Sequence, residues 1–276
     1  MPSLQTKTKE FKDFYESSVW KFHPVVNLYE RIRLQNLFGF LAPKSSDVLL
    51  DAGCGGGTYT KHLAKVSTVI ATDISKKALE NAKKGLSELS EQIHYIVCDN
   101  EYLPLRDNSI DKIGCIDVIE HIVNVKVSLR EMARVSKSHG RISIFTACGK
   151  NKFTLEYILE PVLGKLINSI RLKSGHVHAF STQNLCRLLE PHFVVVKIQY
   201  THHWLGWFFK FLWDISYLNL PGSCSRLPEF KNPILSTFSR VLWLIFEVEY
   251  KLLKDVSSGC EIIVNAYTKE MMSQGI

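Results

Sequence analysis

Four glycines stand within five positions in the stretch VLLDAGCGGGTYTKHLA, which covers residues 48–64. The apolar run before them is typical of a buried parallel strand, and from Tyr59 the apolar residues recur at helical spacing. Glycines at such a junction let the backbone turn sharply and leave room for a ligand at the first turn of the helix. The pattern therefore predicts a ligand-binding loop between a strand and a helix.

Three acidic residues are spaced so that they can serve a ligand in this loop. Asp51 precedes the glycines, Asp73 closes the next strand-like run and Asp99 closes the one after it. A carboxylate in the position of Asp73 can accept both hydroxyls of a ribose. We expect Asp99 to contact an exocyclic amine of an adenine. We expect Asp51 to hold the amino end of an amino-acid moiety, directly or through water.

The spacing discriminates between three ligands that such a loop can bind. A nucleoside triphosphate needs GxxxxGK[ST], and no Lys stands at the required place. A dinucleotide needs GxGxxG, but Thr58 occupies the third glycine position, and this ligand explains only Asp73. An adenosine that carries an amino acid and no phosphate explains three carboxylates in a crevice without a cation. The glycine spacing and the three carboxylates therefore favour an adenosine that carries an amino acid as the ligand.

Strand-like and helix-like segments alternate from residue 46 to residue 147. The predicted strands are residues 48–50, 68–74, 93–99, 111–117, 140–147, 193–200 and 260–269. Ser75 and Ser181 are placed to cap helices. Such alternation indicates a parallel sheet with helices on both faces. We predict an α/β, Rossmann-like fold: a seven-stranded, mostly parallel sheet with helices on both faces and a helical, aromatic-rich cap.

A chain of 276 residues can form one domain with insertions or two domains. We predict a single domain over residues 1–276, with an N-terminal helical segment at 1–40. Its core is expected at about residues 40–147, 181–200 and 259–270. If the fifth and sixth strands are parallel to the rest, residues 148–180 and 201–258 leave the sheet from its carboxyl edge. Because ligands of open α/β sheets bind at that edge, we expect these two insertions to form a cap over the site.

The composition narrows the function classes. The apolar and charged contents, 46% and 22%, are ordinary for a globular protein. The net charge is +7, but Lys and Arg are scattered and no nucleic-acid-binding signature is visible, so no nucleic-acid partner is expected. Seven cysteines without a CxxC pair favour a reduced cytoplasmic protein. The polar N-terminus is unlike a secretory signal, and no apolar run approaches the ~18 residues of a membrane span.

Several motifs, in this order, resemble those of class I S-adenosylmethionine-dependent methyltransferases. LLDAGCGGGTYT matches the D-x-G-x-G-x-G signature, ATDIS is similar to the ribose-binding acidic loop, and CDNEYLPLRDNSID to the adenine-side segment. DVIEHI and LREMARVSKSHGRISIFT resemble the ubiquinone and menaquinone biosynthesis subgroup, with Ser138-His139 where Pro-Gly is usual. The resemblance covers about residues 40–147, with a weaker similarity at GHVHAFSTQNL.

The resemblance implies S-adenosylmethionine as the cofactor and methyl transfer as the reaction. The methionine-side loop would consist of Asp51, Gly53, Gly55 and Gly57. The remaining cofactor contacts would be Asp73 and Ile74 for the ribose and the adenine face, Asp99 and Asn100 for the adenine edge, and Asp117 and Val118 for the methionyl end, mostly through backbone.

Three histidines are candidate catalytic residues. His121 lies in DVIEHI, where the resemblance points it into the cleft; a solvated or hydrogen-bonded histidine without a chemical role is the alternative. His176 and His178 alternate, so both face one side of an extended segment. Any of the three could orient or deprotonate an acceptor. No third ligand stands at a recognisable spacing, so no metal site is expected.

The stretch HHWLGWFFKFLW, residues 202–213, holds three of the five tryptophans and one charge, Lys210. Three interpretations remain open: buried core between cap helices, a pocket or lid for a hydrophobic acceptor, and interfacial contact with a membrane. A second apolar helix, residues 233–250, is interrupted by Arg240 and so is not a membrane span.

The cap composition predicts a small, apolar acceptor such as an isoprenoid, a quinone precursor or a lipid. The protein is expected in the cytoplasm, with peripheral membrane contact as the alternative; the sequence does not indicate the oligomeric state.

Two other function classes are compatible with this fold. One is a non-catalytic scaffold or interaction protein that retains it, and the other is an NAD-dependent oxidoreductase. A scaffold has no need of Asp73 or Asp99, and the dinucleotide spacing fails at Thr58. We therefore predict an S-adenosylmethionine-dependent methyltransferase.

Overall fold

The computed structural model describes residues 13–17, 21–25, 28–152, 154–208, 244–255 and 259–270. Its helices are α2 (Leu28–Leu41), α3 (Thr60–Ala64), α4 (Lys76–Gly85), α5 (Val125–Val135), α6 (Leu155–Lys173) and α7 (Thr182–Leu189), with a 3-10 turn η1 (Ser87–Leu89). Its strands are β1 (Val48–Ala52), β2 (Thr68–Asp73), β3 (Ile93–Val97), β4 (Ile110–Ile116), β5 (Ser136–Ala147), β6 (Phe193–Thr201) and β7 (Glu261–Thr268). Residues 13–17, 204–208 and 244–253 are also helical.

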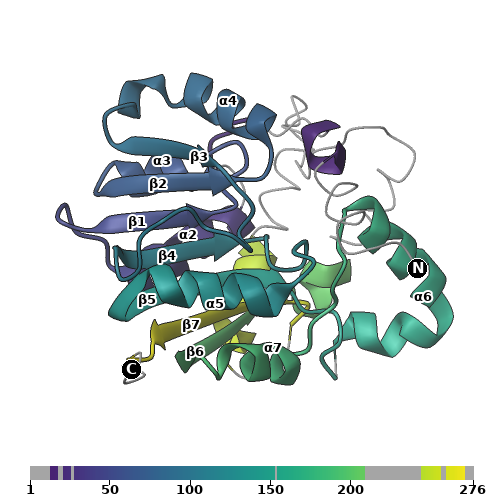
Figure 1. The fold of residues 1–276 in the computed structure, drawn as a ribbon. Helices are drawn as coiled ribbons and strands as arrows, with labels where there is room; N and C mark the ends of the chain where they lie inside the picture. The colour runs from purple at the N-terminus through teal and green to yellow at the C-terminus, as the bar shows by residue number, and fades with distance from the viewer. Residues whose placement is uncertain are drawn as a thin grey trace.

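The strands form one seven-stranded sheet in the order β3-β2-β1-β4-β5-β7-β6 (Figure 1). Strands β1 to β5 run parallel to one another, and β7 is antiparallel to both β5 and β6. Strand β6 is therefore parallel to the first five, and the prediction of a mostly parallel, seven-stranded sheet is confirmed. The strand order reverses between β1 and β4. In open sheets, ligands bind at the carboxyl ends of the strands at such a point.

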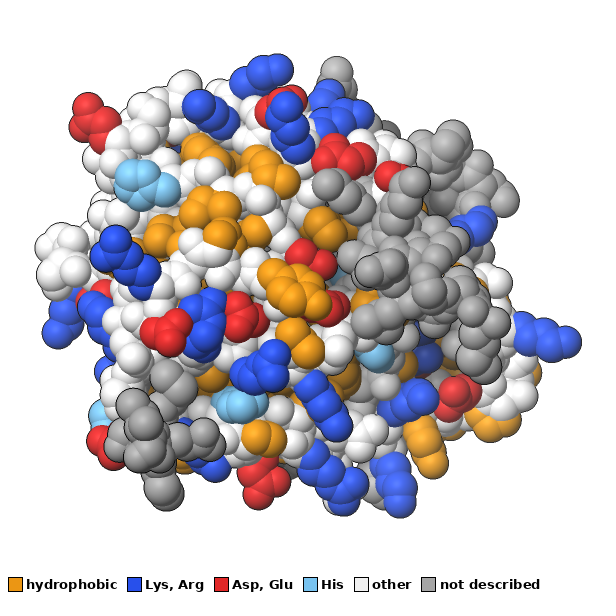
Figure 2. All heavy atoms as spheres, viewed as in Figure 1, with side chains coloured by type: hydrophobic (Ala, Val, Ile, Leu, Met, Phe, Trp, Pro, Cys, Tyr) orange, Lys and Arg blue, Asp and Glu red, His pale blue; other side chains and the backbone are white. Residues whose placement is uncertain are grey.

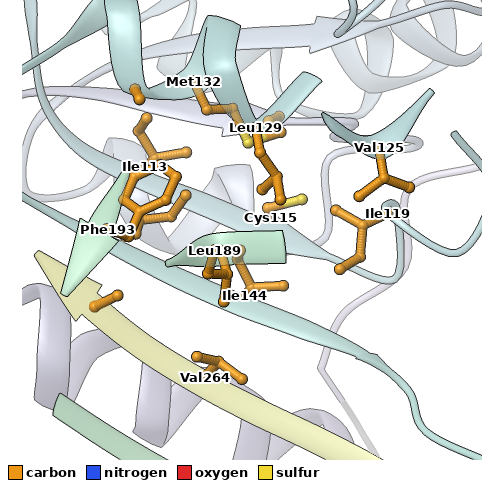
Figure 3. Close-up of a cluster of buried hydrophobic side chains, with 14 of the residues drawn as sticks. Ile113, Cys115, Ile119, Val125, Leu129, Met132, Ile144, Leu189, Phe193 and Val264 are labelled. Carbon is orange, nitrogen blue, oxygen red and sulfur yellow. The ribbon is translucent and has the colours of Figure 1, made fainter. Parts of the chain in front are cut away.

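Helices cover both faces of the sheet. On one face, Leu129 and Met132 of α5 point toward Ile113 and Ile144 of the sheet (Figure 3). On the other face, Leu37 of α2 and other apolar side chains of α2, α3 and the end of α4 form a second buried cluster. Each of the four named core side chains on the first face is fully buried. This two-sided burial explains the near-continuous apolar runs of the strands.

Helix capping and strand ends follow the sequence in part. The Ser75 hydroxyl accepts the Ala78 N–H at 3.1 Å, and the Ser181 hydroxyl accepts the Asn184 N–H at 3.2 Å, which confirms both predicted caps. Strand β5 begins at Ser136, earlier than the predicted start at Gly140. Ser136 pairs with Ile110 and Arg141 pairs with Lys112, so a register shift interrupts the pairing without ending the strand.

Both predicted cap segments leave the sheet from its carboxyl edge. Helix α6 follows β5, and the helical turn at 204–208 follows β6 (Figure 1). Phe209, Phe211 and Trp213 lie outside the described residues, as does the first part of the predicted helix 233–250. Within the part of the chain that the structure describes, no helix has both the length and the apolar character needed to cross a membrane.

Candidate functional site

The glycine loop is tied to the end of β2. The N–H groups of Gly53 and Cys54 both donate to the Thr72 carbonyl at 2.8 Å. The Gly55 N–H donates to Asp73 Oδ2 at 2.8 Å. Gly53, Gly55 and Gly57 have φ values of +80°, +52° and +85°, which side chains disfavour. The predicted strand–loop–helix junction is therefore present, and its path requires glycine.

Among the described residues, none approaches the Cα of Gly55 on its side-chain side, whereas its neighbours are closely packed. A Cβ atom built on Gly55 would meet nothing within 4 Å. A Cβ on Gly56 would lie 2.4 Å from the carbonyl carbon of Lys21, and one on Gly53 would lie 2.5 Å from a methyl group of Val118. Gly53 thus brings the glycine loop against Val118, the residue expected at the methionyl end. The open side of the loop is at Gly55.

Asp73 is held by the backbone on both sides. Its Oδ2 accepts the Gly55 N–H, and its Oδ1 accepts the Ser75 N–H at 2.9 Å. Burial raises the pKa of Asp73, and these two hydrogen bonds oppose the rise. A carboxylate has about four lone-pair sites, so two remain for a ligand. The group is fixed where the loop and the start of α4 meet, and the neighbouring Ile74 is half-buried there.

Asp51 lies deeper than the loop it precedes. Its side chain is buried, and its Oδ2 accepts the Thr60 hydroxyl at 2.5 Å. Burial raises the pKa of Asp51 to about 6, and the charge of Asp73 adds to the rise. This contact joins β1 to the first residue of α3.

Asp99 and Asn100 form the turn after β3. Asp99 Oδ1 accepts the Glu101 N–H at 2.9 Å, and its carbonyl accepts the Tyr102 N–H at 2.9 Å. The buried Asn100 accepts the Thr72 hydroxyl at 3.2 Å, so the turn is fastened to β2. Glu101, which the sequence analysis did not single out, accepts the Asn124 N–H at 2.7 Å. The structure thus brings Asp99 and Asn100 to the same sheet edge as Asp73.

Arg33 of α2 is a site residue that the sequence analysis missed. Its guanidinium donates to Asp117 Oδ2 at 2.5 Å and to Glu261 Oε2 at 3.0 Å, and it lies 4.3 Å from the ring centroid of Phe145. Burial lowers the pKa of Arg33, but the charges of Asp117 and Glu261 more than offset this, so the group is a cation. The expectation of a crevice without a cation is therefore wrong. Asp117, the partner of this cation, has a φ of +54°, which is uncommon for a residue with a side chain.

His121 and His176 meet beside the loop after β4. Their ring centroids are 4.8 Å apart in an edge-on arrangement. His121 Nδ1 lies 3.1 Å from the Gly175 carbonyl, which can only accept a hydrogen bond, so in the neutral imidazole Nδ1 carries the proton and Nε2 has the lone pair. Burial lowers the pKa of His121, which favours that neutral form.

Glu120 joins this pair from the same loop. It is buried, it accepts the Thr146 hydroxyl at 2.7 Å, and burial raises its pKa. Its backbone carbonyl accepts the N–H groups of Val177 and His178, which fastens that segment to the loop. One possible ligand atom from each of Glu120, His121 and His176 falls within 4.8 Å of the others. Among the described residues, these three form a group whose geometry could hold a metal ion, and Glu120 is a member that the sequence spacing did not reveal.

A cavity lies next to this cluster at the carboxyl edge of the sheet. Residues at the ends of β5 and β7, in α6, and at 176–179 and 207 surround it. Its lining residues are Ala147, Gly149, Glu156, Ile167, Ile170, Arg171, Ser174, His176, His178, Ala179, Trp207, Cys260 and Glu261. His176 and His178 both reach it, while Val177 between them is exposed, as the predicted alternation requires.

Trp207 links the two cap segments at the cavity wall. It is buried, and its indole N–H donates to Glu156 Oε2 at 3.1 Å. Glu156 also pairs with Arg171 of α6. Trp204 and Phe208 differ from Trp207, since 51% and 44% of their surfaces are exposed. Trp207 therefore belongs to the cavity wall, and its aromatic neighbours face outward.

Comparison with known proteins agrees with this geometry. Residues 50–144 match the family described as methyltransferase domain. A protein named ubiquinone biosynthesis O-methyltransferase from Thiobacillus denitrificans is 29% identical over 140 residues, which covers 50% of this chain and 59% of that protein. The mitochondrial protein of that name from Rattus norvegicus is 30% identical over 163 residues, which covers 56% of this chain and 46% of that protein. The chain thus spans about half the length of these relatives.

Residues 50–144 thus match a methyltransferase domain, and the resemblance to class I S-adenosylmethionine-dependent methyltransferases of the ubiquinone subgroup, with the cofactor that it implies, is confirmed. Solved structures show the same fold for this methyltransferase domain and its surroundings. Geranyl diphosphate C-methyltransferase from Streptomyces coelicolor, at 14% identity, aligns with a TM-score of 0.63 over 96% of this chain and 99% of that chain. The [4+2]-cyclase SpnF, at 16% identity, aligns with a TM-score of 0.61 over 87% of this chain and 82% of that chain.

Proposed function

We propose that this protein transfers the methyl group of S-adenosylmethionine to a small acceptor bound in the cavity under the cap. One observation carries the proposal: the open side of the loop at Gly55 and the cavity at His176 belong to the same carboxyl edge of the sheet. Methyl transfer is an in-line displacement at a carbon that its sulfonium already activates. The protein therefore has to align donor and acceptor and exclude water.

The donor is assigned to the residues around the glycine loop. In this proposal Asp73 accepts from the ribose hydroxyls, Ile74 covers the adenine face, and Asp99 with Asn100 contacts the adenine edge. Gly53, Gly55 and Gly57 leave room for the methionyl end, and Val118 and Asp117 line it. A methionyl end carries both an ammonium and a carboxylate, and the pair Asp117–Arg33 offers both opposite charges. Asp51 would hold the amino end directly or through water, although its Oδ2 already accepts the Thr60 hydroxyl.

A base is assigned to His121, for an acceptor that must lose a proton. Its Nδ1 faces a carbonyl, which leaves the Nε2 lone pair to take the proton from an acceptor hydroxyl as the oxygen attacks the methyl carbon. His176 and His178 line the cavity and would orient the acceptor. For a carbon nucleophile the same base would remove the proton from the carbon that has gained the methyl group.

The acceptor is proposed to be an apolar molecule with one polar, reacting end. Ile167, Ile170 and Trp207 contribute apolar surface to the cavity lining, and His176 and His178 contribute polar groups. Relatives named for ubiquinone biosynthesis and a structural neighbour named for geranyl diphosphate support an isoprenoid or a quinone precursor as the acceptor.

We also propose that the chain forms one domain in which residues 148–180 and 201–258 are the cap. The protein would be cytoplasmic and would touch membranes through the exposed face of that cap.

The experiment is a calorimetric titration of the purified chain with S-adenosylmethionine and, separately, with NAD. We expect binding of the first and none of the second. Asp73→Ala should weaken the binding of S-adenosylmethionine by roughly 1.5–3 kcal/mol, which is the scale of lost charge-assisted hydrogen bonds. Asp107→Ala, a change at an exposed ion pair with Arg134, is the control and should bind normally.

Binding of NAD alone would show an oxidoreductase, and binding of neither ligand would favour a scaffold. SpnF has this fold and is named for a different reaction, so fold by itself does not decide the activity. Mass spectrometry of molecules that co-purify with the chain, before and after incubation with S-adenosylmethionine, identifies the acceptor by its gain of a methyl group. A chain that binds the donor but methylates no co-purified or isoprenoid-quinone compound would contradict the acceptor assignment.

A further inference from the structure

Residues 13–17 and 21–25, together called the N-terminal segment, pack beside the glycine loop and α4. Its helical turn, residues 13–17, lies on the side of the sheet to which the strand arrows of β2 and β3 point (purple in Figure 1). No sequence motif marks this segment, and none of the roles assigned above uses it. Its contacts reach α4, the glycine loop and the histidine cluster.

On the donor side, Glu16 holds the first turn of α4. Its two carboxylate oxygens accept the N–H groups of Lys76 at 2.7 Å and Lys77 at 3.3 Å. These N–H groups have no intrahelical partner at a helix start, and Ser75 already satisfies the next one, that of Ala78. The negative charge of Glu16 also contributes to the raised pKa of Asp73, after burial, so it acts close to the proposed ribose site.

On the acceptor side, the adjacent Tyr15 packs against the histidine cluster. Its ring centroid lies 5.6 Å from that of His121 in an edge-on contact. A Cβ built on Gly175 would lie 3.0 Å from the Tyr15 hydroxyl and 2.8 Å from the Phe14 ring. Gly175 is the residue whose carbonyl fixes the tautomer of His121. Tyr15 thus touches both the proposed base and the residue that orients it.

Between these contacts, the segment closes over the glycine loop. The backbone of Lys21 packs on Gly56 so tightly that a Cβ there would collide with it. Phe22 packs against Gly85 of α4, and the Lys61 ammonium lies 4.9 Å from the Phe22 ring centroid. The described residues 13–17 and 21–25 therefore contact the start and end of α4, the glycine loop and the histidine cluster.

We propose that Glu16 and Tyr15 are positioning residues that couple the donor site to the base. This inference rests on the proposed function. The two residues are neighbours on one helical turn, so the position of one sets the position of the other. The hydrogen bonds of Glu16 to the Lys76 and Lys77 amides, here called the latch, fasten residues 13–17 to the start of α4. Tyr15 then holds His121 and residues 175–178 in place. Donor binding, which fills the space under the segment, stabilises the latch and through it the acceptor side.

The latch is tested by hydrogen–deuterium exchange of the free protein. Glu16→Ala should accelerate exchange at the amides of Lys76 and Lys77 by roughly three- to tenfold, because both lose their acceptor. The matched control is Glu80→Ala, which removes a carboxylate of α4 that only pairs with exposed Lys76 at 3.9 Å. It should leave both amides unchanged. Unchanged exchange in Glu16→Ala would overturn the latch, whatever the protein binds.

The coupling is tested by repeating the exchange with saturating S-adenosylmethionine. In the wild type, the donor should slow exchange in the glycine loop, in residues 13–25 and in residues 175–178. In Tyr15→Ala the loop should still gain protection but residues 175–178 should not, and Tyr15→Phe, which keeps the ring, should restore the wild-type pattern. A Tyr15→Ala protein that only unfolds at lower temperature, with full donor-dependent protection of 175–178, would overturn the coupling.

The two failures can be told apart. A wild-type chain that binds no S-adenosylmethionine would overturn the proposed function and with it the coupling, while the exchange at Lys76 and Lys77 would still decide the latch. A chain that binds the donor, but without any added protection at residues 13–25, would overturn the inference and leave the proposed function standing.

Discussion

At the scale of single residues, most cofactor-side groups bond to the chain as well as serving the proposed donor. Asp73 bonds two backbone amides, Asn100 bonds Thr72, and Asp51 bonds Thr60. A substitution at these positions therefore changes the loop together with the contact to the donor. Gly55 differs in one respect: its N–H also bonds to the chain, but a side chain added there would meet no described atom near its Cβ.

We expect Gly55→Val to abolish donor binding while the protein still folds. The new side chain would meet no atom of the chain near its Cβ, but it would fill the space of the methionyl end, and the φ of +52° costs roughly 1–2 kcal/mol with a Cβ present. Gly39→Ala, in helix α2 with open space around it, is the control and should bind normally. Calorimetry and urea unfolding measure both quantities. Wild-type affinity in Gly55→Val would exclude this loop as the binding loop.

Asp51 predicts a pH dependence of stability. Its pKa is about 6 in the folded protein against 3.8 ordinarily, so the folded state binds its proton more tightly than the unfolded state does. The stabilisation from that proton is complete below about pH 4 and is lost as the pH rises through 6. Asp51→Asn can still accept from Thr60 and does not titrate. As the pH rises from about 4 to 7, the free energy of unfolding of the variant should therefore increase by roughly 3 kcal/mol relative to that of the wild type, as measured by urea unfolding. A difference between the two proteins that stays constant with pH would contradict a raised pKa at the buried Asp51 carboxylate.

The residues that sequence reasoning found and those it missed differ in the range of their contacts. The glycines, Asp51 and Asp73 belong to strand ends, and local spacing is enough to place them. Arg33 has its partners 84 and 228 residues away, so no local pattern marks it. Glu120 lies beside His121 in the sequence, but only the folded path of residues 175–178 brings His176 to both.

At the scale of elements, the cap is where the sequence left several interpretations open. Alternation of apolar runs predicted the strands, because a buried parallel sheet requires such runs. Helix α6 has no equivalent constraint from the sheet. An ion pair between Glu156 and Arg171 joins two parts of this helix, and the hydrogen bond from Trp207 to Glu156 ties it to the segment after β6. The same composition could have formed core or surface, so only those contacts decide which tryptophan faces the cavity.

We expect Trp207→Ala to cost roughly 3–5 kcal/mol of stability, because it removes a buried ring and leaves Glu156 without that donor. Trp204→Ala, at a half-exposed ring one helical turn away, should stay within about 0.5 kcal/mol. Trp207→Ala should also impair methylation of the acceptor found by mass spectrometry, with S-adenosylmethionine affinity nearly unchanged. A destabilised Trp207→Ala variant that is fully active on its acceptor would show that Trp207 stabilises the hydrophobic core and does not take part in binding the acceptor.

At the scale of the whole molecule, the sheet brings three distant parts of the chain to one edge. The order β3-β2-β1-β4-β5-β7-β6 reverses between β1 and β4, so the loops that follow β1 and β4 meet there. The cap segments after β5 and β6 reach the same edge, and α2 contributes Arg33. The alternation predicted this edge as the site. The contribution of residues before the sheet could not be predicted, because it depends on packing across the finished fold.

The net charge and the outer face of the cap together predict weak binding to anionic membranes. Trp204, Leu205 and Phe208 are each about half exposed on one helical turn, and the chain carries a charge of +7. Lys and Arg side chains are spread over the visible face rather than gathered in one patch (Figure 2), so the attraction should be diffuse and should weaken with salt.

We expect the protein to co-sediment with phosphatidylcholine vesicles that contain phosphatidylserine, and much less with phosphatidylcholine alone. Trp204→Ala should reduce the bound fraction, since interfacial tryptophan contributes apolar contact that charge cannot replace. Val162→Ser, an exposed apolar position on α6 outside that helical turn, is the matched control. Equal sedimentation of Trp204→Ala and the wild type would contradict membrane contact through the outer face of the cap.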